Sequence, residues 1–446
     1  MALLLYRLLF PFAFLAALPF YALRLLHRER GRASQQKPPG YRLGLGERFG
    51  FYDRALRDRL AEDAAPVWIC SISVGETLVA LKLARAFRVK NPDVRVVISV
   101  TTSTGYELLL REAANAPWLI ALYNPIDFAS AARAAIAAVN PRVLVLTEGG
   151  IWPNLLSAAR AAGTRVVLAG ARLSPRSERR WRRFPSLAGT VWGFFDLVCV
   201  PDADDVARFA AIGVAPGRIR HTGSVKLDNA AASAPSREAE FRALVTPLGF
   251  SGPLLVGGST WAPEEKALAA AFRELRADFP MLRLVIVPRH VERAAAIARE
   301  LSDAGLRVVR RSELPASGEA DALLVDTTGE LRDWYRLATV VFVGKSLPGI
   351  TEVGGQNAGE PASYGLPVVF GPHMENFAPL VAHLLQSDAA VQIADSTALT
   401  FALRTLLADS ERRSAIGGRA QNALASHQGA ALRTVECIFD ERGRSY

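Results

Sequence analysis

The feature that most constrains the fold of this 446-residue chain is a repeated alternation of short apolar runs with helical stretches. Strands that alternate with helices in this way form parallel sheets, because each helix carries the chain back to the start of the next strand. The predicted strands fall into two series: 67–73, 95–103, 142–147, 165–169, 197–201 and 219–223, then 254–258, 282–287, 306–310, 322–326, 340–344 and 367–370.

The two series predict two doubly wound α/β domains. Between them, residues 229–238 are small and polar and include a proline, which is typical of an interdomain linker. The predicted organisation is an N-terminal segment at 1–26, a first domain at 40–228, a linker at 229–240, and a second domain at 241–446 with terminal helices. Open α/β sheets bind ligands at the carboxyl ends of their strands. We therefore expect the loops there to line a cleft between the domains.

The N-terminal segment is predicted to be a membrane anchor. Residues 8–23 carry no charge, and Arg7 and Arg24 flank them. The run is shorter than the roughly 20 residues that span a bilayer, and Pro11 and Pro19 argue against a straight helix. Whether it spans the membrane or lies in one leaflet therefore stays open. A cleaved signal peptide is disfavoured, because no small-x-small site precedes a polar segment. The arginines that follow predict a cytoplasmic body by the positive-inside rule.

The net charge of +10 predicts an anionic partner. Residues 172–183 contain six arginines against one glutamate, with Trp181 and the adjoining Phe184 interleaved. Such a mixture suits lipid headgroups. A nucleic-acid partner is disfavoured, because the sequence has no RNA- or DNA-binding motif. The three cysteines fit no metal spacing and indicate a reducing compartment rather than a disulfide scaffold.

Candidate catalytic residues follow strands of the first series. Residues 68–77 (WICSISVGET) place Glu76 at the turn from a strand into a helix predicted at 77–90. A carboxylate near a helix N-terminus is stabilised as the anion, which suits a general base. The competing interpretation is a capping glutamate that only accepts backbone N–H groups. Glu148 follows the third predicted strand, and Lys226 lies in the loop that ends the first domain.

Glycine-rich loops follow the strands of the second series. Glycines let backbone N–H groups approach a phosphate, and helix N-termini favour its charge. Glu360 opens a helix beside glycines and could accept both O–H groups of a ribose diol. His290 and His373 lie in these loops, and we assign them no chemical role. The loops are 257–260, 287–290, 326–331, 343–346, 354–362 and 371–373.

Taken in order, these motifs resemble those of the Kdo (3-deoxy-D-manno-octulosonic acid) transferases of lipopolysaccharide synthesis. The resemblance covers essentially the whole chain and implies a GT-B architecture. That architecture has two Rossmann-like domains facing a cleft, with an N-terminal membrane-anchor helix. The matching motifs are GERFGFY, SVGE, WPN after a Glu-containing strand, ARLSxRS, GSxKxD, GSTxxxEE, PRH, DTxGEL and GPHxxNF.

The resemblance also implies the reaction. Kdo passes from CMP-Kdo to the phosphorylated, acylated glucosamine disaccharide of a lipid A precursor (lipid IVA), with inversion. The reaction takes place on the cytoplasmic face of the inner membrane, without a metal or other cofactor. Glu76 would deprotonate the acceptor hydroxyl, and Glu148 and Lys226 would stabilise the transition state. The residues implied to contact CMP are Pro288, Arg289, Thr328, Gly329, Glu330, Asn357, Ala358, Gly359 and Glu360.

The sequence departs from the family pattern mainly near the nucleotide-sugar loops. Gly150 stands where a second glutamate is usual, and Gln356 and 358–359 replace a His and a Pro-Leu pair. Trp261 stands in place of a common His, and Lys345 in place of a common Gly. These changes keep open a GT-B transferase that uses a related nucleotide sugar or acceptor. A non-catalytic, membrane-bound nucleotide- or lipid-binding protein is disfavoured, because the three candidate catalytic residues occur together.

Overall fold

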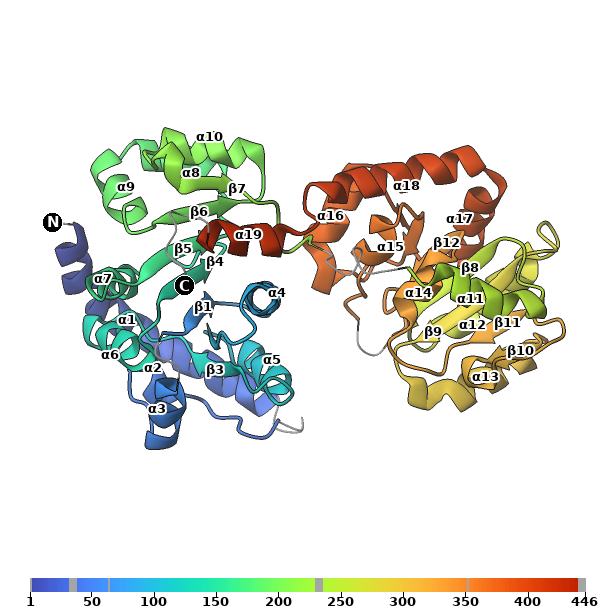
Figure 1. Cartoon of the computed structure of the whole chain (residues 1–446), viewed down its shortest axis with the longest axis horizontal. Helices are drawn as coiled ribbons and strands as arrows, with labels where there is room; N and C mark the ends of the chain where they lie inside the picture. Colours follow the sequence, from blue (N-terminus) through green and yellow to red (C-terminus); the bar gives the residue numbers. More distant parts are fainter. Residues whose placement is uncertain (1, 32–37, 63–64, 229–235, 351–352, 440–446) are drawn as a thin grey trace. The chain divides into compact units, whose positions relative to one another are not determined.

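The structure is a computed structural model that describes residues 2–31, 38–62, 65–228, 236–350 and 353–439. It divides into two compact units (Figure 1). Unit 1 comprises Met1–Val225 and Gly429–Tyr446, and unit 2 comprises Lys226–Gln428. Each unit contains a seven-stranded parallel sheet, so the predicted α/β class with two Rossmann-like doubly wound domains is confirmed.

The sheet of unit 1 has the strand order β3-β2-β1-β4-β5-β6-β7. Its first four strands are buried along their whole length, as expected for a parallel sheet covered by helices on both faces. The order reverses between β1 and β4, and the crevice at such a switch point is where open α/β sheets bind ligands. The strands are β1 (Val67–Ser71), β2 (Val96–Val100), β3 (Leu119–Tyr123), β4 (Val143–Thr147), β5 (Arg165–Ala169), β6 (Leu197–Val200) and β7 (Ile219–His221).

Helices cover both faces of this sheet. Side chains alternate along β1, so Trp68 and Cys70 join the core under one helix layer while Val67 and Ile69 join the other. The first layer contains α3 (Arg54–Ala61), α6 (Ala129–Val139), α7 (Pro153–Ala161), α9 (Pro185–Trp192) and α10 (Ala203–Ala211). The second contains α4 (Val74–Lys90), α5 (Ser103–Ala113) and α19 (Ala430–Phe439). The remaining helices of unit 1 are α1 (Ala2–Gly31), α2 (Leu45–Arg48) and α8 (Pro175–Arg182).

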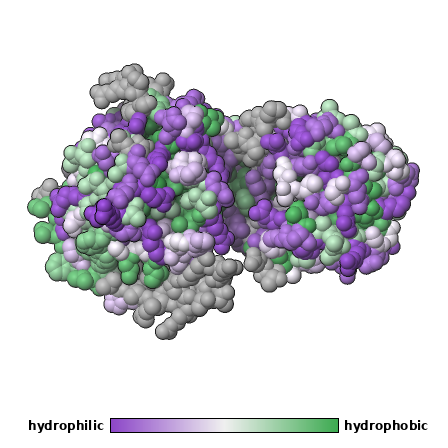
Figure 2. Space-filling model, turned by 60° about the horizontal axis from the view of Figure 1, so that its bottom comes forward, coloured by the Kyte–Doolittle hydropathy of each residue, from purple (hydrophilic) through white to green (hydrophobic). Residues whose placement is uncertain are grey.

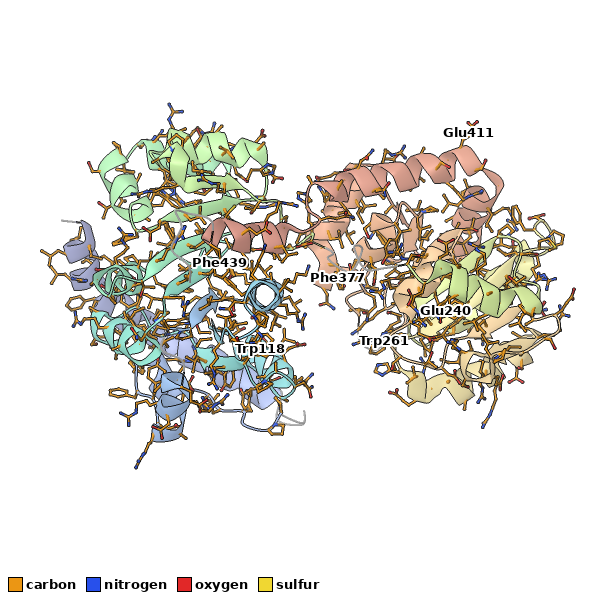
Figure 3. The ribbon with its side chains drawn as sticks, viewed as in Figure 1. Trp118, Glu240, Trp261, Phe377, Glu411 and Phe439 are labelled. Atoms are coloured by element: carbon orange, nitrogen blue, oxygen red, sulfur yellow. The ribbon has the colours of Figure 1, made fainter. Side chains whose placement is uncertain are left out.

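The placement of α19 corrects the predicted domain boundary. The second domain was expected to run to residue 446, whereas α19 packs on unit 1. The Phe439 ring, at the end of α19 (Figure 3), lies 5.8 Å from the Phe87 ring of α4. Val435 and Ile438 are buried in the same core. The amphipathic pattern of α19 predicts a buried face, but a pattern does not indicate which of two sheets it covers.

The sheet of unit 2 has the order β10-β11-β9-β8-β12-β13-β14, with its switch point between β8 and β12. Its strands are β8 (Leu254–Thr260), β9 (Arg283–Pro288), β10 (Val308–Arg310), β11 (Ala322–Leu324), β12 (Val340–Val343), β13 (Val368–Phe370) and β14 (Val391–Gln392). Its helices are α11 (Glu238–Val245), α12 (Glu264–Leu275), α13 (Ala294–Asp303), α14 (Leu331–Arg336), α15 (Gly359–Ser363), α16 (Ala378–Gln386), α17 (Ser396–Ala408) and α18 (Ser410–Ala425).

Other expected elements differ in detail. The run at β3 has the same apolar character as its neighbours but was not among the predicted strands, and neither was the two-residue β14. Most of the predicted linker, 229–235, lies outside the described residues, and 238–240 already belong to α11.

The N-terminal segment is helical over Ala2–Gly31, with Pro11 and Pro19 inside the helix. Within the described part of the chain, no helix combines the length and the apolar character needed to cross a membrane. The predicted membrane anchor at 1–26 stays a prediction.

Candidate active site

Glu76 lies in the first turn of α4, directly after β1. Ser73 caps this helix, because its hydroxyl accepts the backbone N–H of Glu76 at 3.3 Å. The helix therefore begins at Val74, earlier than the predicted 77, and Glu76 lies inside its first turn, close to the positive end of the helix. The half-buried Glu76 carboxylate folds back, and its Oε2 accepts the N–H of Ile72 at 3.0 Å.

Thr147 connects Glu76 to the neighbouring strand. This residue ends β4, and its Oγ1 lies 3.1 Å from Glu76 Oε2 and 3.0 Å from the carbonyl oxygen of Cys70. Its single proton is shared between these two acceptors. A capping glutamate would accept a backbone N–H group, as Glu76 does from Ile72. Capping alone does not explain why Glu76 also accepts the Thr147 hydroxyl from a neighbouring strand. The contact with Thr147 therefore places Glu76 at the switch point between β1 and β4.

Glu148 follows Thr147 and lies at the same edge of the sheet. It is half-buried, and its φ of 57° is left-handed, a conformation that costs energy for a residue with a side chain. Its N–H donates to the carbonyl of Ala169 on β5 at 2.8 Å, which holds the turn in place. The structure thus brings together two of the three candidate catalytic residues, Glu76 and Glu148, through the ends of adjacent strands.

Lys226, the third candidate, is the first residue of unit 2 and directly follows Val225, the last residue of unit 1. It is half-buried. In unit 1, the Nζ of Lys82 on α4 donates to the carbonyl of Val225 at 3.1 Å, so the chain is fixed to the Glu76 helix immediately before Lys226.

The candidate nucleotide loops of unit 2 all lie at the carboxyl edge of its sheet. Residue 288 ends β9 and 289 follows it, 328–330 precede α14, and 357–360 form the start of α15 and the two residues before it. Arg289, Thr328 and Gly329 are exposed. Asn357 shapes its own turn, since its Oδ1 accepts the N–H of Gly359 at 3.0 Å. Because β11, β9, β8 and β12 are consecutive neighbours, these loops lie along one side of unit 2.

The side chain of Glu330, a predicted CMP contact, is held within its own loop. Both carboxylate oxygens accept hydrogen bonds from Arg311, each at 2.9 Å, and Oε2 also accepts the hydroxyl of Thr327 at 2.7 Å. This paired carboxylate shapes the loop. The neighbouring residues 328–329 are exposed, and the predicted contact of this loop with CMP stays a prediction.

Glu360 is half-buried. Burial raises its pKa, and the nearby Arg332 opposes that shift while Asp333 adds to it. Asp333 is only 1% exposed and lies 3.8 Å from guanidinium nitrogens of Arg332 and Arg237. Glu360 therefore lies near charged side chains of α14, of which Asp333 is buried, so its ionisation is sensitive to its neighbours.

A basic surface lies on α8. The helix is capped by Ser174 and carries Glu178 as its acidic residue, which pairs with Arg182 at 3.6 Å. Trp181 points inward onto the Trp192 ring at 5.5 Å, whereas Phe184 is exposed, so only one of the two aromatic residues predicted there lies on the surface. The exposed side chains Arg179, Arg180, Arg182 and Arg183 form what we call the α8 arginine cluster.

Comparisons with known proteins decide the family. The family model described as 3-deoxy-D-manno-octulosonic-acid transferase (kdotransferase) matches residues 44–229. The 3-deoxy-D-manno-octulosonic acid transferase of Bordetella pertussis is 35% identical over 392 residues, 85% of this chain and 88% of that protein. This chain belongs to the Kdo transferase family. It is accordingly a glycosyltransferase.

Other similar proteins span most of the chain or one unit of it. The enzyme of the same name from Haemophilus influenzae is 29% identical over 405 residues, 90% of this chain and 92% of its own length. Among solved structures, the C-terminal CMP-Kdo binding domain of WaaA from Acinetobacter baumannii is 28% identical and covers 42% of this chain and 96% of that chain, with a TM-score of 0.39.

Two residues that depart from the Kdo transferase pattern meet at the switch point of unit 2. Trp261 follows β8 (Figure 3) and Lys345 follows β12. The Lys345 ammonium lies 4.4 Å from the centre of the Trp261 ring. The His290 ring packs edge-on against the same indole at 4.7 Å. Lys345 has a φ of 60°, a conformation in which glycine carries no strain. The sequence marks both positions as unusual, but it does not show that they touch.

A third departure, Gly150, is explained by packing. A Cβ at this position would lie 2.8 Å from the Trp152 ring, so the indole occupies the space that a side chain at 150 would need. In this member of the Kdo transferase family, a glutamate at 150 requires Trp152 to move.

The buried glutamates of the GSTxxxEE motif hold loops in position. Glu264 accepts backbone N–H groups of Trp261, Lys345, Ser346 and Leu347 at 2.8–3.1 Å. Glu265 pairs with Arg293 at 3.0 Å. Sequence reasoning recognised the motif but missed this role, as it missed the role of Thr147. A glutamate or a threonine in a sequence does not indicate which distant residue it will contact in the folded chain.

Proposed function

We propose that this enzyme transfers Kdo from CMP-Kdo to a hydroxyl of lipid IVA, the phosphorylated, acylated glucosamine disaccharide that precedes lipid A. The observation that carries the proposal is the placement of Glu76 and Glu148 at the ends of adjacent strands, connected by Thr147. The Bordetella pertussis relative named 3-deoxy-D-manno-octulosonic acid transferase, 35% identical over most of the chain, supports the donor sugar.

Glu76 is proposed as the general base. The N–H of Ile72 and the hydroxyl of Thr147 both stabilise its carboxylate as an anion. The acceptor hydroxyl gives its proton to Glu76 while its oxygen attacks the anomeric carbon of Kdo. The bond from that carbon to the phosphate oxygen breaks, and CMP leaves with the electron pair. Because this is one displacement, the anomeric configuration inverts.

Charges around the reacting centre complete the mechanism. As the bond to CMP lengthens, positive charge grows on the sugar and negative charge on the phosphate. The Glu148 carboxylate would stabilise the sugar, and Lys226 and Arg289 would stabilise the departing phosphate. The leaving group is a monophosphate, so fixed cations suffice and the proposed reaction needs no metal or other cofactor.

The loops of unit 2 are proposed to bind CMP. Arg289 supplies a positive charge and residues 328–329 are exposed. The Glu360 carboxylate would accept the ribose hydroxyls. The Trp261–Lys345 pair adds a second cation and an aromatic face at the same edge of the sheet. An anionic sugar nucleotide matches this chemistry.

The acceptor is a lipid, and we propose that the enzyme works on the cytoplasmic face of the inner membrane. The outer face of α1 exposes Leu5, Leu8 and Phe12, with 56%, 59% and 72% of their surfaces accessible. Hydrophobic residues gather along one margin of unit 1 in Figure 2. Apolar residues that enter a bilayer, together with the α8 arginine cluster that attracts anionic headgroups, would hold the protein at the surface.

Mass spectrometry of lipid IVA incubated with CMP-Kdo and the detergent-solubilised protein tests this function. We expect one or more Kdo mass increments that persist when EDTA is added. A parallel series with other CMP-activated ulosonic acids tests the donor. If a folded protein adds no Kdo but uses another donor, the assignment of CMP-Kdo is wrong.

A further inference from the structure

Polar contacts connect the first turns of α1 to the rest of unit 1. The Tyr6 hydroxyl donates to Asp127 Oδ2 at 2.8 Å, and Arg7 Nε donates to Asn154 Oδ1 at 2.8 Å. Phe10 and Phe14, four and eight residues after Tyr6, pack edge-on against the Phe128 ring at 5.4 and 5.1 Å. A spacing of four places these residues on one face of the helix. That face is distinct from the outer face of α1, which exposes Leu5, Leu8 and Phe12.

Asp127 joins α1 to α7. Its side chain is buried, and its two oxygens accept the N–H groups of Asn154 and Leu155 at 3.0 and 2.9 Å. The first N–H groups of a helix have no partner inside the helix, so Asp127 caps α7 from a different loop. Asn154 in turn donates through Nδ2 to the carbonyl of Asp127 at 2.6 Å. Tyr6 and the first turn of α7 therefore share one carboxylate.

The first turn of α7 continues the loop that carries Glu148. Only 149–152 separate that residue from α7. A residue with a left-handed φ keeps its conformation only when the structure on both sides of it is held. On one side the hydrogen bond to Ala169 holds the Glu148 N–H, and on the other side Asp127 holds α7.

The loop that contains Asp127 also reaches the Glu76 strand. Asn124 donates through Nδ2 to the carbonyl of Ser71 at 2.5 Å. The next residue, Ile72, donates its N–H to Glu76. Residues 124–128 are thus connected to both candidate catalytic carboxylates and, through Asp127, to α1.

We propose that α1 positions the Glu148 loop in addition to binding the membrane, with Tyr6, Arg7 and Asp127 as positioning residues. This rests on the proposed function for the role of Glu148. The polar face of α1 holds the start of α7 through Asp127 and Asn154, while the opposite apolar face stays available to lipid. Turnover therefore depends on docked α1 even when the acceptor is presented in detergent, where no membrane is needed.

The test uses the full chain with Tyr6→Phe and Arg7→Gln combined. Tyr6→Phe keeps the ring, which lies 5.2 Å from Phe10, and removes only the donor to Asp127. Arg160→Gln is the matched control, because it breaks the pair between Arg160 and Asp196 at the other end of α7. Three quantities are measured: amide exchange of 150–156, kcat and the KM for CMP-Kdo in micelles, and binding to vesicles of anionic phospholipid.

For the double variant we expect faster exchange at Asn154 and Leu155, a kcat lowered about 10-fold, an unchanged KM for CMP-Kdo and unchanged vesicle binding. Unchanged exchange and kcat would overturn the proposal, and so would a kcat that falls only in proportion to vesicle binding, because α1 would then be an anchor alone. Should the wild-type protein transfer no Kdo, the proposed function fails, and the exchange at Asn154 still decides whether α1 holds the loop.

Discussion

Thr147→Val is the most informative single substitution in unit 1. Valine has the same shape as threonine, so the substitution removes the hydroxyl that reaches Glu76 while the packing at the end of β4 is kept. A hydrogen bond to a charged group contributes about 1.5–3 kcal/mol. Because the proton is shared between Glu76 Oε2 and the carbonyl of Cys70, we expect an effect at the lower end of this range. That corresponds to a kcat about 10-fold lower.

The assay is CMP release at saturating CMP-Kdo and acceptor. Thr147→Ser keeps a hydroxyl and should retain most of the activity. Thr77→Val is the matched control, since the Thr77 hydroxyl donates to the carbonyl of Ser73 at 2.8 Å in the same turn. The control should lower the free energy of unfolding by about 1 kcal/mol with little change in kcat. A Thr147→Val enzyme as fast as the wild type would refute the positioning of Glu76 by this strand.

Three further predictions concern the surface and unit 2. Reversing the charges of the α8 arginine cluster should weaken binding to anionic vesicles more at low salt than at high salt, and equal binding would exclude its role. Arg307 holds the pKa of Asp321 at about 2 instead of 3.8, so this pair stabilises unit 2 fully above about pH 4 and less as the pH falls toward 2. Asp321→Asn should therefore lower the urea midpoint of unfolding at pH 6. The change corresponds to a loss of about 1–2 kcal/mol of unfolding free energy, and the loss should be much smaller at pH 2.5. Arg311→Lys breaks the paired contact with Glu330 and should weaken CMP binding roughly 10-fold by calorimetry, while the control Arg307→Lys should leave the affinity unchanged.

The sequence predicts the fold class and most strands because burial on both faces produces continuous apolar runs, which are visible without any partner. It does not predict which sheet a helix covers. The apolar face of α19 is equally compatible with either sheet, and its place on unit 1 follows from packing between Phe439 and Phe87, which are far apart in the chain.

The residues of the candidate site also fall into those that the sequence predicts and those that it does not. The positions of Glu76 and Glu148 are predictable, since Glu148 directly follows β4, Glu76 lies in the helical turn after β1, and the ends of parallel strands share one edge. Thr147, Asp127 and Arg311 are not, because a threonine at a strand end or an aspartate in a loop has many ordinary roles. Their roles depend on partners that only the folded chain brings close.

The central claim is that Glu76 performs the chemistry in unit 1 and that unit 2 binds the nucleotide independently of it. The most direct measurement is kcat for Glu76→Gln, made together with the calorimetric affinity for CMP. We predict a kcat lowered by about 10²–10⁴-fold with the affinity for CMP unchanged, as expected when a general base is removed. A Glu76→Gln enzyme that retains wild-type kcat would contradict the account, and so would one that loses CMP binding in proportion to its rate.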